Sequence, residues 1–343
     1  MPKIDISAHL ALEEAGFLHI NRHAELPLMI HNYSPKAQYE RHWTPETLLS
    51  RGLVTDLEGH IVARPFGKFF NLDEHVGLYG SLPDEPFEVY EKMDGSLGIL
   101  FHYEGQLQIV TRGSFHSEQA LIAQRIFKEK YQHVALSPNQ TYLVEIIYPS
   151  NRIVVNYGEM TDLVLLAVLE TKTGDEIPLE DIGLPLVKRY HGIRDLAALR
   201  QSQPDNREGY VIRFESGLRV KLKFDEYVRL HRIITGINTR VIWEELKNGN
   251  SLEALLEDVP DEFYQWVKKE VKALHDAYAK IETQVQSEFK HFDDRKSAAA
   301  YFRAHTQYPA IMFKLLDQKP YSEIIWKLIR PVSEKPFSEE ENS

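Results

Sequence analysis

The sequence has 343 residues, a net charge of −11 and no cysteine. The length allows two domains of ordinary size, and a hydrophobic content of 43% is normal for a globular protein. The lack of cysteine excludes disulfides, thiolate nucleophiles and zinc–thiolate sites, so any metal must be bound through oxygen or imidazole. The acidic balance disfavours a protein that coats nucleic acid through a broad basic surface, but it leaves room for a local basic groove.

The N-terminal stretch MPKIDISAHLALEEAGFLHI carries acidic residues inside its apolar pattern, which is unlike a signal peptide. Nowhere in the chain do about 18 uncharged apolar residues follow one another, as a membrane-spanning helix would require. The sequence therefore predicts a cytoplasmic protein with no membrane partner.

Short apolar runs separated by turn residues dominate the chain up to about residue 240. The clearest are PLMIHN, GLVTDLEGHIVARP, GILFHYEGQLQIVTRG, TYLVEIIYP, DLVLLAVLE and EGYVIRFESGLRVKLK. Several of them are paired through Glu-Gly or Ser-Gly, which are typical of hairpin turns. Because few helical patterns lie between these runs, the sequence predicts an α+β domain with antiparallel sheets, and not a doubly wound parallel sheet.

The hydrophobic period changes near residue 240. Apolar residues then recur every three or four positions, which marks one face of a long helix; they are Phe263, Val267, Val271, Leu274, Tyr278, Ile281, Val285 and Phe289. Further helical patterns follow in AAAYFRAH and YSEIIWKLI. The sequence therefore predicts a first domain at 1–239, an all-α C-terminal domain at 240–332, and a disordered acidic tail at 333–343.

One lysine stands at an unusual place in the stretch FEVYEKMDGSLGILFHYEG. Lys92 ends an apolar run, and Asp94, Gly95 and Ser96 then open the next run. This Lys-x-Asp-Gly pattern is weak evidence alone, since it should occur by chance in about one chain in ten of this length. Lys92 is therefore either a solvated residue at a strand end or a nucleophile.

Charged residues on three later strand-like segments favour a nucleophile. Glu145 lies inside the apolar run YLVEIIY, where an unpaired carboxylate would be costly. Glu208 precedes YVIRF, and Lys221 and Lys223 are two residues apart in RVKLK, so they project from the same face of a strand. A strand that faced only an apolar core would not place two lysines there.

These segments, in this order, resemble the motifs of the nucleotidyltransferases that form a covalent lysyl-nucleotide, which are the DNA and RNA ligases and the mRNA capping enzymes. The matching stretches are KMDGS (92–96), VEIIYP (144–149), EGYVIR (208–213) and KLK (221–223). Upstream, SRGLV (50–54) and RPFGKFFNLDE (64–74) are similar specifically to the ATP-dependent phage RNA ligase 1 type, which repairs tRNA. The resemblance implies that residues 1–239 form an antiparallel-sheet nucleotidyltransferase domain.

The resemblance assigns Lys92 as the nucleophile that attacks ATP. Neutral lysine is scarce at pH 7, because its ordinary pKa is about 10.4, so a catalytic lysine needs nearby cations that lower its pKa. Lys221, Lys223 and Lys68 are predicted to supply that field. By resemblance, Arg51 and Lys68 would hold the β- and γ-phosphates, while Lys221 and Lys223 would contact the α-phosphate.

The remaining contacts to ATP are also implied by the resemblance. Glu145 would hold the ribose hydroxyls, and Arg112 is expected near the nucleotide. Asp94 and Glu208 would orient a Mg²⁺ or Mn²⁺ ion through water, a role that suits oxygen ligands.

Three more residues complete the predicted nucleotide site. Gly95 belongs to it as part of the lysine motif. Tyr157 would stack on adenine opposite Val211, although core packing is the commoner role for such a tyrosine.

The implied activity is that of an ATP-dependent RNA ligase. Lys92 takes AMP from ATP and passes it to an RNA 5′-phosphate, and a 3′-hydroxyl then displaces AMP and seals the strand. The expected partners are RNA with those two ends, with tRNA as one candidate, and a separate end-healing enzyme.

Two alternatives stay open. A DNA-joining or capping enzyme would share the motifs, but such enzymes normally append a β-barrel domain, whereas the sequence beyond residue 240 predicts helices. A nucleotide-binding regulatory module of the same fold would keep the pocket without turnover and would form no covalent AMP adduct.

Overall fold

The computed structural model describes residues 2–252, 256, 259, 261–334 and 336. The predicted acidic tail at 333–343 lies largely outside these described residues. The chain divides into two compact units, Met1–Val228 and Arg229–Ser343, a division that falls inside α7 (Asp225–Gly236) and upstream of the predicted boundary at 239. The predicted fold class is confirmed, because antiparallel sheets build the first unit and helices build the second.

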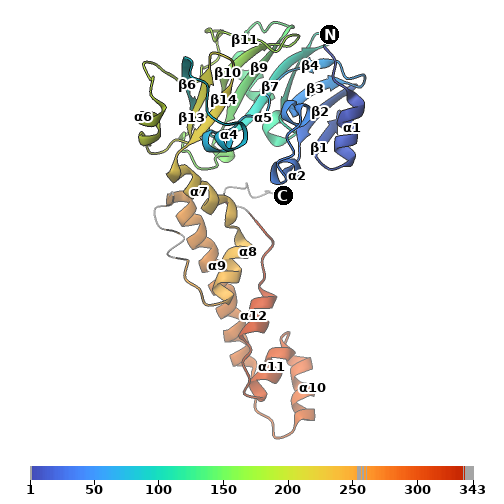
Figure 1. Ribbon diagram of the computed structural model, residues 1–343. Helices are drawn as coiled ribbons and strands as arrows, with labels where there is room; N and C mark the ends of the chain where they lie inside the picture. The colour runs from blue at the N-terminus through green and yellow to red at the C-terminus, as the bar shows by residue number, and fades with distance from the viewer. Residues whose placement is uncertain (1, 253–255, 257–258, 260, 335, 337–343) are drawn as a thin grey trace. The chain divides into compact units, whose positions relative to one another are not determined.

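Three sheets form the first unit (Figure 1). The N-terminal sheet has the order β1-β2-β3-β4 and the central sheet has the order β11-β10-β9-β7-β8. The lysine sheet, named for Lys92 at the end of β6, has the order β12-β6-β13-β14-β5, and within it β14 pairs with β5 in parallel. The strands are β1 (Leu18–Arg22), β2 (Leu28–Tyr33), β3 (Arg51–Asp56), β4 (Ile61–Ala63), β5 (Phe70–Asn71), β6 (Phe87–Lys92), β7 (Ser96–Tyr103), β8 (Gln106–Thr111), β9 (Gln140–Ile147), β10 (Asp162–Glu170), β11 (Glu176–Ile177), β12 (Arg189–Tyr190), β13 (Gly209–Phe214) and β14 (Arg219–Lys223).

Two tight hairpins form where the sequence predicts them. Between β7 and β8, Glu104 and Gly105 have φ values of 50° and 78°. Positive φ at both central residues gives the turn whose twist matches that of the flanking strands. Between β13 and β14, Gly217 follows Ser216 and has a φ of 86°, a positive value that glycine adopts without steric cost.

The central sheet is covered on both faces, as the alternating residues of β9 show. The even-numbered residues at 142–148 pack with apolar residues of α5 (Glu118–Ile126). On the opposite face, Leu143 packs with the N-terminal sheet, and Ile147 packs in a cluster that includes Tyr90 of β6. Glu145 projects from this same face between them, so the alternation of the strand carries its carboxylate to the junction of the three sheets.

Short helices connect the strands of the first unit. Ser34 and Ser117 cap two of them, since each hydroxyl accepts a hydrogen bond from a backbone N–H of the first turn. The helices are α1 (Ile6–Glu14), α2 (Pro35–Tyr39), α3 (Pro45–Leu49), α4 (Leu72–Tyr79), α5, a π-helical turn (Phe127–Tyr131), a 3₁₀ turn (Pro149–Asn151) and α6 (Leu196–Gln201).

The second unit is helical, and the long helix predicted from the apolar period is present as α9 (Asp261–Glu288). Val285 of this helix packs with Phe302 and Met312, and the Trp243 indole N–H donates to the backbone oxygen of Trp326 at 2.8 Å. The other helices among the residues that the structure describes are α8 (Thr239–Lys247), α10 (Arg295–His305), α11 (Pro309–Leu316) and α12 (Ser322–Leu328). Among the described helices, none is both long enough and apolar enough to cross a membrane.

One glycine sets how closely the strands of the lysine sheet approach one another. Gly209 lies opposite Lys92 on β6 and opposite Lys223 on β14. It has a φ of 149°, and a Cβ there would lie 2.0 Å from the carbonyl oxygen of Leu222. Only glycine fits this position without moving the strand that carries Lys223.

Gly209→Ala is therefore expected to lower the free energy of unfolding by more than about 2 kcal/mol, because it adds a backbone clash to the strain of positive φ. Gly217→Ala is the matched control, since Gly217 also has positive φ but has open space around its Cβ position. That control should cost about 1 kcal/mol. Urea denaturation measures both changes, and equal losses would contradict the proposed clash.

Candidate active site

A cavity of about 170 Å³ opens beside the lysine sheet and the central sheet. We call it the Lys92 cavity. Its walls carry charged groups on an apolar and aromatic background, a combination that is typical of ligand sites. The lining residues are Arg51, Phe66, Phe69, Tyr90, Glu91, Lys92, Met93, Leu97, Glu145, Leu166, Glu176, Val187, Val211, Arg219, Lys221 and Lys223.

A buried carboxylate lies between two lysines at this cavity. Lys92 Nζ lies 2.5 Å from Glu208 Oε2, and Lys223 Nζ lies 2.9 Å from Glu208 Oε1. The Glu208 side chain is only 3% exposed. A carboxylate buried to this degree needs paired charges, so Glu208 fixes both ammonium groups at the edge of the cavity.

The register of the lysine sheet explains why these residues meet. Gly209 is flanked by Lys92 and Lys223, and two residues along β13 Val211 is flanked by Tyr90 and Lys221. Side chains two residues apart on a strand project from the same face. The structure therefore brings together Lys92, Lys221, Lys223 and Val211 from the predicted site.

The ammonium group of Lys221 is buried among other cations. Burial, followed by the charges of Lys68 and Lys92, lowers the pKa of Lys221 to about 7. We predicted from the sequence that neighbouring cations would act on the nucleophile. In the structure the charge of Lys92 is one of those that act on Lys221, and the Lys92 ammonium itself is held by Glu208.

Glu145 and Gly95 contact one another directly. The Gly95 N–H donates to Glu145 Oε1 at 2.9 Å, which ties the turn after Lys92 to the central sheet. A Cβ on Gly95 would lie 2.6 Å from the backbone oxygen of Ile146, so only glycine permits this approach. Burial raises the pKa of Glu145 to about 7, and the charge of Lys92 opposes that rise.

Asp94 is buried beneath the turn instead of lining the cavity. Its Oδ2 accepts hydrogen bonds from the N–H groups of Val154 and Val155, each at 2.9 Å. Its Oδ1 accepts one from the hydroxyl of Tyr227 at 2.7 Å. Both oxygens predicted to face a metal ion through water are thus engaged within the protein, and the side chain is 4% exposed.

Tyr157 is also outside the Lys92 cavity. Its hydroxyl accepts a hydrogen bond from the Asp94 N–H at 2.8 Å, and its ring packs with the apolar cluster around Ile147 and Val187. The alternative interpretation of Tyr157, core packing, describes this placement. The aromatic side chain opposite Val211 at the cavity is Tyr90.

The three remaining predicted cations, Arg51, Lys68 and Arg112, differ in their contacts and in whether they line the Lys92 cavity. Arg51 lines the Lys92 cavity, and its buried Nη1 has no hydrogen-bond partner among the described residues. Lys68 Nζ lies 5.0, 4.9 and 5.2 Å from the ring centres of Tyr33, Trp43 and Phe70. Arg112 donates to the Tyr33 hydroxyl at 3.3 Å and does not line the cavity.

Sequence reasoning missed several residues that shape the site. Tyr90 could have been found, because it is two residues before Lys92 on the same strand face. Phe69 and Arg219 carry no such local signal, since their positions depend on how the segment at 64–70 packs on the lysine sheet. Gly209 was visible only as a part of the stretch EGYVIR.

Comparison with known proteins confirms the resemblance to RNA ligases. Residues 49–182 match the family model described as RNA ligase. That match includes Lys92, Asp94 and Glu145, and it ends before Glu208 and the two lysines of β14.

Two relatives extend the similarity. The chain is 26% identical over 244 residues to a protein of Autographa californica nuclear polyhedrosis virus provisionally named a bifunctional polynucleotide kinase/RNA ligase. It is 29% identical over 210 residues to a provisionally named RNA ligase of Thermovibrio ammonificans. These alignments cover 62% and 56% of this chain but only 35% and 55% of the relatives. Among solved structures, an archaeal ATP-dependent RNA ligase aligns over 93% of this chain and 97% of its own, with 16% identity and a TM-score of 0.47.

The raised pKa of Glu145 predicts how the ATP-free protein responds to pH. The folded carboxyl keeps its proton up to about pH 7, whereas the unfolded one releases it near its ordinary value of 4.5, so wild type loses stability as pH rises through that window. Glu145→Gln should match wild type near pH 4.5 and exceed its free energy of unfolding by about 1–3 kcal/mol at pH 8. Urea unfolding across this range tests the change, and a pH-independent difference would contradict it.

Proposed function

We propose that this protein is an ATP-dependent RNA ligase that joins RNA 5′-phosphate and 3′-hydroxyl ends and acts in RNA repair, with tRNA as a candidate substrate. The observation that carries the proposal is the Lys92 ammonium, held by Glu208 at a cavity that Lys221, Lys223 and Arg51 also line. A primary amine beside so many cations suits attack on a polyphosphate. The RNA ligase match of residues 49–182 supports RNA as the substrate.

In the first step, Lys92 Nζ gives up a proton and attacks the α-phosphorus of ATP. An N–P bond forms, the bond from the α-phosphorus to the bridging oxygen breaks, and pyrophosphate leaves with the electron pair. Glu208 Oε2, at 2.5 Å, orients the amine, and the proton passes to solvent, so that Glu208 stays ionised. The product is lysyl-AMP on Lys92.

The cations of the cavity stabilise the charge that this step redistributes. We assign the α-phosphate to Lys221 and Lys223 of β14, which project from the same face of the lysine sheet as Lys92 of β6. Arg51, whose buried Nη1 has no hydrogen-bond partner in the described part of the chain, is assigned to the departing phosphates, and Lys68 is assigned to them as well. Arg112 is proposed to lie near the same phosphates.

The second and third steps move AMP onto RNA and then release it. An oxygen of the RNA 5′-phosphate attacks the adenylate phosphorus, the N–P bond breaks, and Lys92 regains its proton. The RNA 3′-hydroxyl then loses its proton and attacks the activated 5′-phosphorus, so that a phosphodiester forms and AMP departs. A separate enzyme that restores these ends is the proposed partner.

The nucleoside is proposed to lie between the lysine and central sheets. Glu145 is the carboxylate available for the ribose hydroxyls, and Gly95 holds it in place. Tyr90 and Val211, opposite one another in the sheet, are the proposed contacts of the base. Tyr157 then acts indirectly, since its hydroxyl holds the backbone of the turn at Asp94.

A divalent cation fits this site best beside Glu208. When Lys92 is neutral, Glu208 keeps only the charge of Lys223, and Mg²⁺ or Mn²⁺ held by Glu208 through water would supply positive charge next to the transferred phosphate. Asp94 fits the role less well, because both of its oxygens already accept hydrogen bonds. All residues assigned to ATP precede Thr239, so we propose 1–239 as the nucleotidyltransferase domain and 240–332 as a helical domain that influences the choice of RNA.

Lys92→Arg should abolish lysyl-AMP formation and still fold, because arginine keeps a positive charge beside Glu208 but is a poor nucleophile. Sealing of pre-adenylated RNA should partly survive, since that substrate bypasses the nucleophile. The assay incubates protein with α-labelled ATP and Mg²⁺ or Mn²⁺, denatures it, and measures acid-labile AMP on the protein. A labelled Lys92→Arg variant would refute the assignment, and an unlabelled wild type would favour a binding module without turnover.

The proposed division of phosphate contacts predicts that substitutions of the two groups of cations slow different steps of the reaction. Lys221→Ala or Lys223→Ala should slow both lysyl-AMP formation and sealing of pre-adenylated RNA about a hundredfold, or about 3 kcal/mol, because the same phosphate-transfer site serves each step. Arg51→Ala or Lys68→Ala should slow lysyl-AMP formation and largely spare sealing. Single-turnover rates of the two reactions separate these effects, and equal damage by all four changes would contradict the division.

A further inference from the structure

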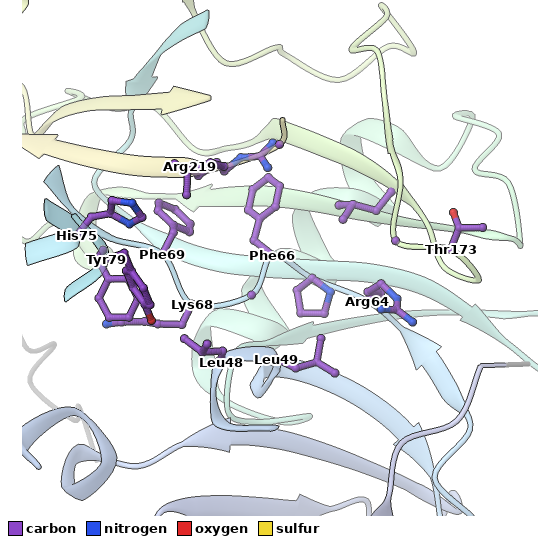
Figure 2. Close-up of a pocket in the computed structure, with 17 residues that line it drawn as sticks. Leu48, Leu49, Arg64, Phe66, Lys68, Phe69, His75, Tyr79, Thr173 and Arg219 are labelled. Atoms are coloured by element: carbon purple, nitrogen blue, oxygen red, sulfur yellow. The ribbon is translucent and has the colours of Figure 1, made fainter. Parts of the chain in front are cut away.

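A second, larger cavity adjoins the Lys92 cavity, and the steps above use only Lys68 of the residues that this second cavity does not share with the first. It has a volume of about 680 Å³, within the range of ligand sites, and it shares Phe66, Phe69 and Arg219 with the Lys92 cavity. We call it the Lys68 cavity after Lys68 in its lining. Figure 2 shows His75 and Tyr79 at one end of this lining and Arg64 and Thr173 at the other.

The charge of the Lys68 cavity is one-sided. Its lining includes Arg64, Lys68 and Arg219, and it contains no aspartate or glutamate. Arg219 is paired with Glu176 from outside the lining, but within the described residues no carboxylate pairs with Arg64 or Lys68. A protein with a net charge of −11 thus presents a local cationic hollow beside its proposed catalytic lysine.

Arg64 is held with its terminal nitrogens available. Its backbone N–H donates to Thr141 Oγ1 at 3.0 Å, and its Nε donates to the backbone oxygen of Thr171 at 3.3 Å. Gly174 lies against the same side chain, where a Cβ would come within 2.8 Å of Arg64 Cδ. The described residues supply no hydrogen bond to either Nη, so the planar end of the guanidinium is positioned to bind an anion such as a phosphate.

Aromatic rings form the other end of the lining. The Tyr79 ring lies 5.1 Å from that of His75 and 5.7 Å from that of Phe70, and Tyr79 is 54% exposed. An exposed ring braced on one side by other rings suits stacking against a flat base. Cationic groups combined with aromatic rings are the pattern by which proteins bind single-stranded nucleic acid.

We propose that the Lys68 cavity binds the terminal nucleotides of single-stranded RNA, with a phosphate on Arg64 and a base on Tyr79. This inference rests on the proposed function, because it gives the RNA end a place beside the lysine that carries AMP. Both the RNA strand that ends in a 5′-phosphate and the strand that ends in a 3′-hydroxyl offer a phosphate for Arg64 and a base for Tyr79.

The test measures binding of fluorescent single-stranded RNA by anisotropy, without ATP, so it does not depend on lysyl-AMP formation. Tyr79→Ala should raise the Kd about tenfold, whereas Tyr79→Phe should keep the Kd of the wild type, because stacking needs only the ring. Arg64→Ala should weaken binding and lower the slope of log Kd against log salt by about 0.7, the value for one lost phosphate contact. Arg125→Ala on α5 and Tyr39→Ala at the end of α2 are exposed matched controls that should bind as wild type does.

Two RNAs distinguish the strands. One has a 5′-phosphate and a blocked 3′ end, and the other has a 5′-hydroxyl and a free 3′-hydroxyl. If the variants lose affinity for only one of these RNAs, the cavity is assigned to that strand and the proposal is supported. The proposal would be overturned if Arg64→Ala and Tyr79→Ala kept the Kd and the salt slope of the wild type. It would also be overturned if the control variants lost as much RNA affinity as these two variants. Loss of lysyl-AMP formation in these variants with unchanged RNA binding would assign the cavity to ATP instead. A wild type that binds RNA as expected but forms no lysyl-AMP would refute the proposed function alone.

Discussion

The buried carboxylate of Glu208 is the constraint on which the arrangement of the site depends. An ionised group at 3% exposure is tolerated only when opposite charges lie against it, and here they come from two strands, as Lys92 on β6 and Lys223 on β14. The pair of contacts therefore holds the lysine sheet in one register as well as positioning an amine. Loss of the charge on Lys92 would leave Glu208 with Lys223 alone beside it, so the charge state of Lys92 and the affinity of Glu208 for another cation would depend on each other.

Close backbone approach is the second requirement, and two glycines provide it next to residues that line the cavity. Gly209 lets β13 and β14 come together where Lys223 meets Glu208, and Gly95 lets the turn after Lys92 reach Glu145 on the central sheet. A side chain at either position would separate charged groups that act together. The weak Lys-x-Asp-Gly pattern thus has a physical basis in its glycine, and its aspartate anchors the same turn through three hydrogen bonds.

Local patterns in the sequence predicted the features that depend on neighbouring residues. The two hairpins, the long helix α9 and the shared face of Lys221 and Lys223 all follow from period and turn chemistry. Placement of single side chains in the tertiary structure was less predictable. Tyr157 packs in an apolar cluster instead of lining the cavity, and Lys68 lies among aromatic rings. These placements could not be predicted from local patterns, because they depend on how segments far apart in the chain pack together. The roles assigned to these residues remain predictions until they are tested.

The distribution of charge bears on what kind of RNA such a protein can hold. Exposed charges are screened beyond about 8 Å at physiological salt, so an overall charge of −11 opposes a long polyanion lying across the surface more than it opposes one phosphate inside a hollow. Arg64 and Lys68, which pair with no carboxylate among the described residues, lie in such a hollow, where aromatic rings add contacts that salt does not screen. A nucleic acid would therefore be held by a few nucleotides at an end, which is the part of an RNA that a sealing reaction uses.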